Sequence, residues 1–176
     1  YTGQSDRSPA SLIADRDAGL RRLQAIHSTV AVHGSNMAIA RTAADAAAIK
    51  AAGKRVVYIS MENASPLEHD PSLLSYYHQA GLTLLSITHT KNNGFGDSGT
   101  DKPEWNGLSP AGRKLVEDAT ALGIMIDQSH ASDAVFDDLI AMLPVPMVLS
   151  HSSAKALYDH PRNIDDARLR QMAAKG

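Results

Sequence analysis

The chain repeats one local order: a segment of helical character ends at a glycine, and an apolar run follows at once. Gly53 precedes the run 55–61, Gly81 precedes 82–88 and Gly123 precedes 124–128. Glycine closes helices readily because it adopts the left-handed conformation, and a short apolar run is typical of a strand in a buried parallel sheet. The order therefore predicts βα units, in which helices cover parallel strands.

The full pattern alternates helices and strands along all 176 residues. Ser8 is suited to cap the first helix, with Pro9 in its first turn. The first strand, 55–61, is expected to be buried on both faces because its apolar character is nearly continuous. Two folds fit this order, a (β/α)₈ barrel and an open doubly wound sheet. We expect helices over 8–32, 42–52, 71–79, 110–122, 132–142 and 161–175, and strands over 55–61, 82–88, 124–128 and 145–150.

Composition and charge exclude several classes of function. The formal net charge is -2, with acidic and basic residues interspersed, so no basic surface for nucleic acid is expected. The longest apolar runs fall far short of the roughly 20 residues that span a bilayer, so no membrane segment is expected. Residues 1–7 lack the charged and apolar regions of a signal peptide, and localisation stays open. The sequence contains no cysteine, which leaves histidines and carboxylates as the strong candidate ligands for a transition metal.

A histidine or a glutamate follows each of the four expected strands. Glu62 follows the first strand, His89 the second, His130 the third and His151 the fourth. The carboxyl ends of parallel strands are where α/β proteins place their active sites, and in a barrel these four side chains would converge on one mouth.

The chemistry of this set points to a hydrolytic metal site. Imidazoles and a carboxylate without thiols are ligands for a catalytic Zn²⁺ or Mn²⁺, which lowers the pKa of a bound water toward ~7. A carboxylate can also bridge two cations. The sequence contains no Gly-x-Ser-x-Gly, phosphate loop or His-Glu-x-x-His motif, and the glycine-rich loop 90–108 is long enough to be functional. The other histidines are interpreted as structural or surface residues: His27, His33, His69, His78 and His160.

Three stretches carry a resemblance to a known family: 86–93 with 97–98, then 107–130, then 148–163. In order and separation they are similar to the zinc dipeptidases of the membrane (renal) dipeptidase family, here of a bacterial type. The resemblance covers nearly the whole chain. It implies a (β/α)₈ TIM barrel and a metal-dependent dipeptidase that hydrolyses the amide bond of dipeptides with a water activated by two zinc ions.

The resemblance also implies roles for single residues. Glu62 resembles the carboxylate that bridges the two metals, and His130 and His151 resemble ligands of one of them. His89 resembles the catalytic histidine that contacts the tetrahedral oxyanion of the substrate. Arg162 resembles the arginine that binds the substrate carboxylate, a role suited to a guanidinium. The family tendency toward dimers makes a homodimer the expected partner besides a small dipeptide.

The resemblance is incomplete in one respect. The family also has a His-x-Asp pair on its first strand and an Asp near its last, and neither has a match here. A complete barrel takes around 250 residues. We therefore expect 1–176 to form the central part of a single hydrolase barrel domain, about four to five βα units, with some metal ligands lacking and little activity alone. The alternatives are another binuclear-metal barrel hydrolase, of lactonase or deaminase type, and a non-catalytic remnant of the dipeptidase fold.

Overall fold

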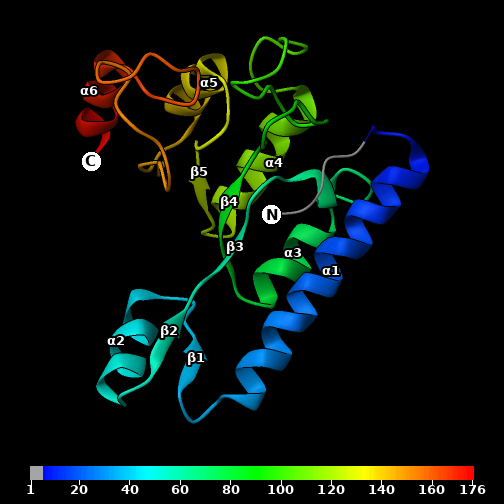
Figure 1. Cartoon of the computed structure of the whole chain (residues 1–176), viewed down its shortest axis with the longest axis vertical. Coiled ribbons are helices and arrows are strands. Elements are labelled where there is room, and N and C mark those ends of the chain that lie inside the picture. The colour runs from blue at the N-terminus through cyan, green and yellow to red at the C-terminus, as the bar shows by residue number, and fades with distance from the viewer. Residues whose placement is uncertain (1–5) are drawn as a thin grey trace.

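The computed structural model describes residues 6–176, so the first five positions of the 1–176 domain, and most of the stretch examined for a signal peptide, lie outside it. Helices and strands alternate through the described residues in a mixed α/β fold (Figure 1). The helices are α1 (Pro9–Val32), α2 (Ala43–Ala51), η1 (Ser65–Leu67), α3 (Leu73–Gln79), α4 (Pro110–Ala121), α5 (Asp133–Met142) and α6 (Asp166–Lys175). The strands are β1 (Met37–Ile39), β2 (Arg55–Val57), β3 (Ile59–Met61), β4 (Leu82–Ser86) and β5 (Met125–Asp127).

The expected helices are confirmed, because local signals fix where most of them begin. The Ser8 hydroxyl accepts a hydrogen bond from the amide of Ser11, and Pro9 opens α1 as expected. At α2, Thr42 and Asp45 form a reciprocal capping box. The last helix begins later than expected, because Asp165 caps α6 and residues 161–165 form a turn.

All the strands pair in parallel, as predicted, but the expected strand 55–61 is wrong as a single element. The chain divides at the exposed Tyr58: β2 pairs with β1, and β3 pairs with β4. The second sheet has the order β3-β4-β5. Burial on both faces is also wrong for this segment, because Ile59 and Met61 are buried while Ser60 between them is exposed.

The expected strand 145–150 forms only one parallel bridge, between Val148 and Asp127. The amide of Val148 donates to the carbonyl of Ile126, and its carbonyl accepts from the amide of Gln128. Pro146 removes a backbone donor from the first half of the segment, and Pro144 removes another just before it, so a longer ladder cannot form there.

Helices that include α4 and α5 pack on one face of β3-β4-β5, and the other face is hollowed, while α2 packs beside β2. Leu85, Val116 and Phe136 belong to one apolar core and are almost fully buried. On the opposite face mostly polar side chains, together with Leu84, line a hollow of about 360 Å³ that includes Glu62 and His151. Within residues 6–176 this sheet remains an open arc, and none of the helices has the length and apolar character needed to cross a membrane.

Gly112, which is buried in α4, provides a test of this packing. A Cβ atom there would lie 1.8 Å from the carbonyl oxygen of Phe95. Alanine ordinarily stabilises a helix relative to glycine, so open space would make Gly112→Ala favourable. We expect a loss of about 1–3 kcal/mol of folding free energy instead, measured by urea unfolding.

Gly34→Ala is the matched control. Its added Cβ would meet nothing closer than 3.5 Å, so its unfolding midpoint should stay near that of the parent chain. A stabilised Gly112→Ala chain would contradict the close approach of α4 to Phe95.

Candidate metal centre

Three of the residues selected at the strand ends converge on one point. The Oε1 atom of Glu62 lies 3.1 Å from Nε2 of His130 and 3.0 Å from Nε2 of His151. The two Nε2 atoms are 2.8 Å apart. Parallel pairing of β3, β4 and β5 produces this arrangement, because it brings the strand ends to the same edge of the sheet.

His89 lies beside the triangle formed by Oε1 of Glu62 and the Nε2 atoms of His130 and His151, but is not part of it. Its ring is 4.0 Å from the ring of His130, centroid to centroid, and its Nε2 atom is 4.0 Å from Oε1 of Glu62. Burial lowers the pKa of His89, against the opposing effect of Glu62, so a neutral ring is favoured. His89 therefore lies next to the three convergent atoms, but its own ring nitrogens are not among them.

The backbone around Glu62 is held by a pair of asparagines. Asn63 has a left-handed φ of 76°, which asparagine tolerates better than most residues. Its Oδ1 atom accepts from the amide of Ser65 and from the side chain of Asn93, which also donates to the carbonyl of Ile87. These bonds connect the end of β3 to the loop that follows β4 and so hold Glu62 in register with His89.

His130 is held by packing in a strained backbone conformation. Its φ is 75°, and its carbonyl accepts from the amide of Gly99 at 2.8 Å. A non-glycine residue in this region is uncommon and is found most often at functional sites. Its side chain is only 5% exposed, and its Nδ1 atom has no hydrogen-bond partner among residues 6–176. Burial, with the nearby charges of Arg162 and His89, lowers the pKa of His130 to about 4.

The sequence interpretation missed Asp127, a buried carboxylate behind the triangle. Its oxygens accept from the hydroxyls of Ser86 and Ser150 and from the amides of Ser129 and Ser150. Burial works to raise the pKa of Asp127, but these hydrogen bonds outweigh it and hold the pKa below its usual value. The available signal was its place at the end of an expected strand, three residues before His130.

Arg162 approaches the centre from the segment before α6. One Nη2 hydrogen bond reaches the carbonyl of His151 at 3.3 Å, and Nε is buried without a hydrogen-bond partner in the described part of the chain. Burial lowers the pKa of Arg162, while the charges of Glu62 and Asp127 oppose this effect. The guanidinium therefore lies within the electrostatic reach of the metal-ligand candidates.

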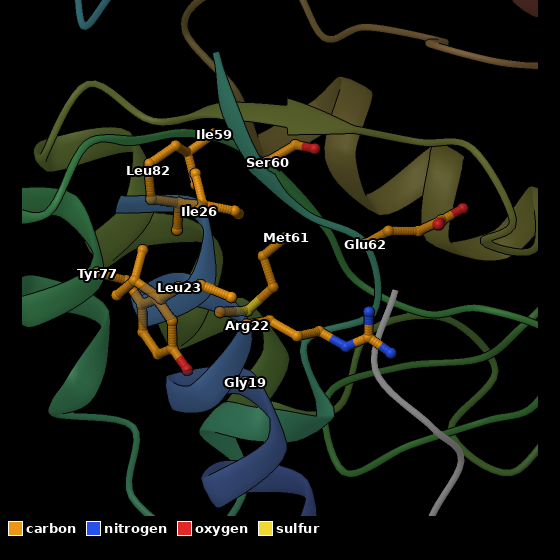
Figure 2. Close-up of a pocket in the computed structure, with 11 residues that line it drawn as sticks. Gly19, Arg22, Leu23, Ile26, Ile59, Ser60, Met61, Glu62, Tyr77 and Leu82 are labelled. Atoms are coloured by element: carbon orange, nitrogen blue, oxygen red, sulfur yellow. The ribbon is translucent and has the colours of Figure 1, made fainter. Parts of the chain in front are cut away.

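Two of the histidines interpreted as structural make structural contacts within the described residues. His27 bonds the carbonyl of Ala80 through Nε2, and His160 accepts from the amide of Arg162. A separate pocket of about 300 Å³ lies between α1 and β3, lined by apolar side chains such as Leu23 and Met61. Glu62 also lines this pocket, and in Figure 2 its carboxylate extends away from the apolar side chains, so the pocket borders the centre at this residue.

The triangle fits a divalent metal ion in both chemistry and size. A carboxylate oxygen and two imidazole nitrogens face one another at 2.8 to 3.1 Å. A neutral imidazole carries one proton on its two nitrogens, so each ring has a lone pair to offer a metal. Ligands at about 2.0–2.1 Å from a tetrahedral Zn²⁺ are roughly 3.3 Å apart, so a small outward adjustment would admit the ion. The three atoms are the candidate ligands found within the described residues.

The sequence matches one protein family over nearly its full length. Residues 2–176 fit the profile of the membrane dipeptidase family, Peptidase family M19. The chain belongs to the membrane dipeptidase family. The predicted family membership is therefore confirmed.

Relatives of this dipeptidase-family chain include curated proteins and solved structures. It is 31% identical to the dipeptidase tcpJ of Claviceps purpurea over 93% of this chain and 39% of the relative. The structure of the probable dipeptidase PvdM from Pseudomonas aeruginosa superposes with a TM-score of 0.91 at 28% identity, over 96% of this chain and 44% of that one. A metallo peptidase from Rhodobacter sphaeroides, liganded with a phosphinate mimic of dipeptide L-Ala-D-Ala, gives a TM-score of 0.87 at 26% identity, over 93% and 48%. The chain spans about two fifths of the length of the curated relatives it matches.

The buried His130 of this family member makes the stability of the metal-free chain depend on pH. The unfolded histidine has a pKa near 6.5 and the folded one a pKa of about 4, so between these values the unfolded chain binds a proton that the folded chain excludes. We expect the free energy of unfolding to fall as the pH falls from about 6.5 to 4. Urea unfolding over this range measures the slope.

His130→Asn is the control, since asparagine tolerates the left-handed φ and does not titrate. The free energy of unfolding of this variant should depend less steeply on pH than that of the parent chain. A His130 ring that titrates near 6.5 by NMR in the folded chain would contradict the expectation.

Proposed function

We propose that these residues belong to a metal-dependent dipeptidase that hydrolyses the amide bond of dipeptides. The observation that carries the proposal is the convergence of Glu62, His130 and His151 on one point at the carboxyl edge of a parallel sheet. Membership of the membrane dipeptidase family and the dipeptide mimic bound by the Rhodobacter relative support the substrate class.

We assign Glu62, His130 and His151 as the ligands of the metal, and we assign the metal as zinc. Nitrogen and carboxylate ligands without thiols suit catalytic zinc, and the low pKa of His130 favours the neutral form that a ligand requires. A bound divalent cation supplies Lewis acidity and lowers the pKa of water. Glu62, the acidic member of the set, is assigned as the carboxylate able to contact a second cation in a complete barrel. The (β/α)₈ barrel and self-association into a dimer remain predictions of the family resemblance.

The other two predicted residues are assigned to the substrate. Arg162 binds the terminal carboxylate: its Nε–H, which has no hydrogen-bond partner within residues 6–176, is a donor that the fold leaves for an acceptor. His89, whose ring lies tilted against that of His130 and outside the ligand triangle, stabilises negative charge on the carbonyl oxygen under attack. Fixing the terminal carboxylate and the carbonyl under attack in this way orients the amide bond for hydrolysis.

Removal of the metal tests the reaction class. We expect exhaustive chelation to abolish dipeptide hydrolysis by the protein produced from its complete gene, and Zn²⁺ to restore it, because the ion supplies the Lewis acid. Glu62→Gln should prevent recovery at the same Zn²⁺ concentration. Full turnover after chelation, or metal binding without hydrolysis of any dipeptide, would favour another hydrolase or the non-catalytic remnant.

Arg162→Ala tests the substrate class. Loss of a charge-assisted carboxylate contact should remove about 3–4 kcal/mol of binding free energy in the transition state. The value of kcat/KM for dipeptides should therefore fall roughly 10²- to 10³-fold. A dipeptide with an amidated C-terminus offers no carboxylate, so its hydrolysis should depend little on this substitution.

Arg170→Ala is the matched control, because Arg170 is an exposed arginine of α6 whose partner Asp166 lies 4.0 Å away. If Arg162→Ala slows both substrates equally, the arginine does not bind the carboxylate, and lactonase or deaminase substrates become the ones to examine.

A further inference from the structure

His151 is the most exposed of the three candidate ligands, with 47% of its side chain accessible. Packing alone cannot fix the orientation of a ring this open. Hydrogen bonds fix it instead: the His151 amide donates to the Ser129 hydroxyl at 3.1 Å, and Nδ1 lies 2.8 Å from Oγ of Ser150. The atom opposite Nδ1 in the ring, Nε2, is the one in the metal triangle.

The direction of the Ser150 hydrogen bonds follows from Asp127. Ser150 Oγ lies 2.5 Å from Oδ2 of Asp127, and the same carboxylate accepts from the Ser86 hydroxyl and from two backbone amides. A carboxylate surrounded by donors is ionised and can only accept. The single hydroxyl proton of Ser150 must therefore point to Asp127, which leaves an oxygen lone pair facing His151.

That lone pair favours a proton on Nδ1 of His151, against Oε1 of Glu62, an acceptor 3.0 Å from Nε2 that favours the other tautomer. Only a ring with its proton on Nδ1 can donate to Ser150 Oγ, and in the neutral ring this places the lone pair on Nε2. Nε2 is the atom aimed at Glu62 and His130. A relay from carboxylate to hydroxyl to imidazole thus prepares the ring for a metal before any metal arrives.

We propose that Asp127 and Ser150 are positioning residues, which hold His151 with its proton on Nδ1 and its Nε2 lone pair turned to the metal. The proposal rests on the metal centre of the proposed function and extends it beyond the ligands. The relay serves His151 alone: the 5% exposed His130 is held by packing, and its Nδ1 has no hydrogen-bond partner among residues 6–176. Partners behind metal ligands of this kind typically contribute about 10- to 100-fold to metal affinity.

Two measurements on the full chain test the relay. The first is the tautomer of His151 in metal-free, ¹⁵N-histidine-labelled protein, read from long-range ¹⁵N couplings. The second is the affinity for Zn²⁺, measured by competition with a chelator. Ser150→Ala should lose the Nδ1–H preference and bind Zn²⁺ roughly 10- to 100-fold more weakly.

Asp127→Asn should do the same, because an amide that donates to Ser150 turns its hydroxyl toward His151 and moves the ring proton to Nε2. Ser150→Thr retains the hydroxyl and should stay within roughly threefold of the parent chain. The matched control is Ser153→Ala, an exposed serine in the same segment whose hydroxyl lies outside the relay. Thermal unfolding of each metal-free variant establishes that it is folded, and Ser150, being exposed, should tolerate its changes.

The outcomes separate the relay from the metal centre. An Nε2–H tautomer in the metal-free parent chain, or an unchanged Zn²⁺ affinity in folded Ser150→Ala, would overturn the relay and leave the metal centre standing. A parent chain that shows the Nδ1–H tautomer and binds no Zn²⁺ would support the relay geometry and overturn the metal centre.

Discussion

Parallel pairing of β3, β4 and β5 is the constraint on which the candidate site depends. It brings the residues after these strands to one edge of the sheet, and the Val148 bridge adds His151 to the same edge. Asp127 reinforces this arrangement, because its carboxylate joins the side chain of Ser86 in β4 to Ser150 in the next segment. The apolar core on the opposite face supports the sheet but contributes no ligand.

Two physical means hold the ligand rings, and they match the exposure of each ring. His130 is buried, strained and in ring contact with His89, so its orientation follows from packing and its low pKa keeps it neutral. His151 is nearly half exposed, so its orientation follows from hydrogen bonds. Glu62 lies between these two cases, at 28% exposure, where a carboxylate can still exchange water for a cation. A centre built in this way combines one rigid ligand with ligands open to solvent.

Much of the fold was predictable because its signals are local. Pro9 and the Thr42 capping box fix helix starts from a few neighbouring residues. The break at Tyr58 was not predictable from apolar runs alone, since it depends on which strand each segment meets. The single bridge at Val148 had a local signal in Pro146, which cannot donate to a ladder. The convergence of Glu62, His130 and His151 was predicted from strand ends, whereas Asp127 was missed. Its partners Ser86 and Ser150 lie 41 and 23 residues away in the sequence, so only the fold reveals them.

The central claim is that Glu62, His130 and His151 form a binding site for one divalent metal ion, and anomalous diffraction from crystals grown with Zn²⁺ tests it most directly. The expected result is an anomalous peak about 2.0–2.2 Å from Oε1 of Glu62 and from both Nε2 atoms. A map with no peak among these three side chains, or with the zinc bound elsewhere while their rings and carboxylate point apart, would contradict it.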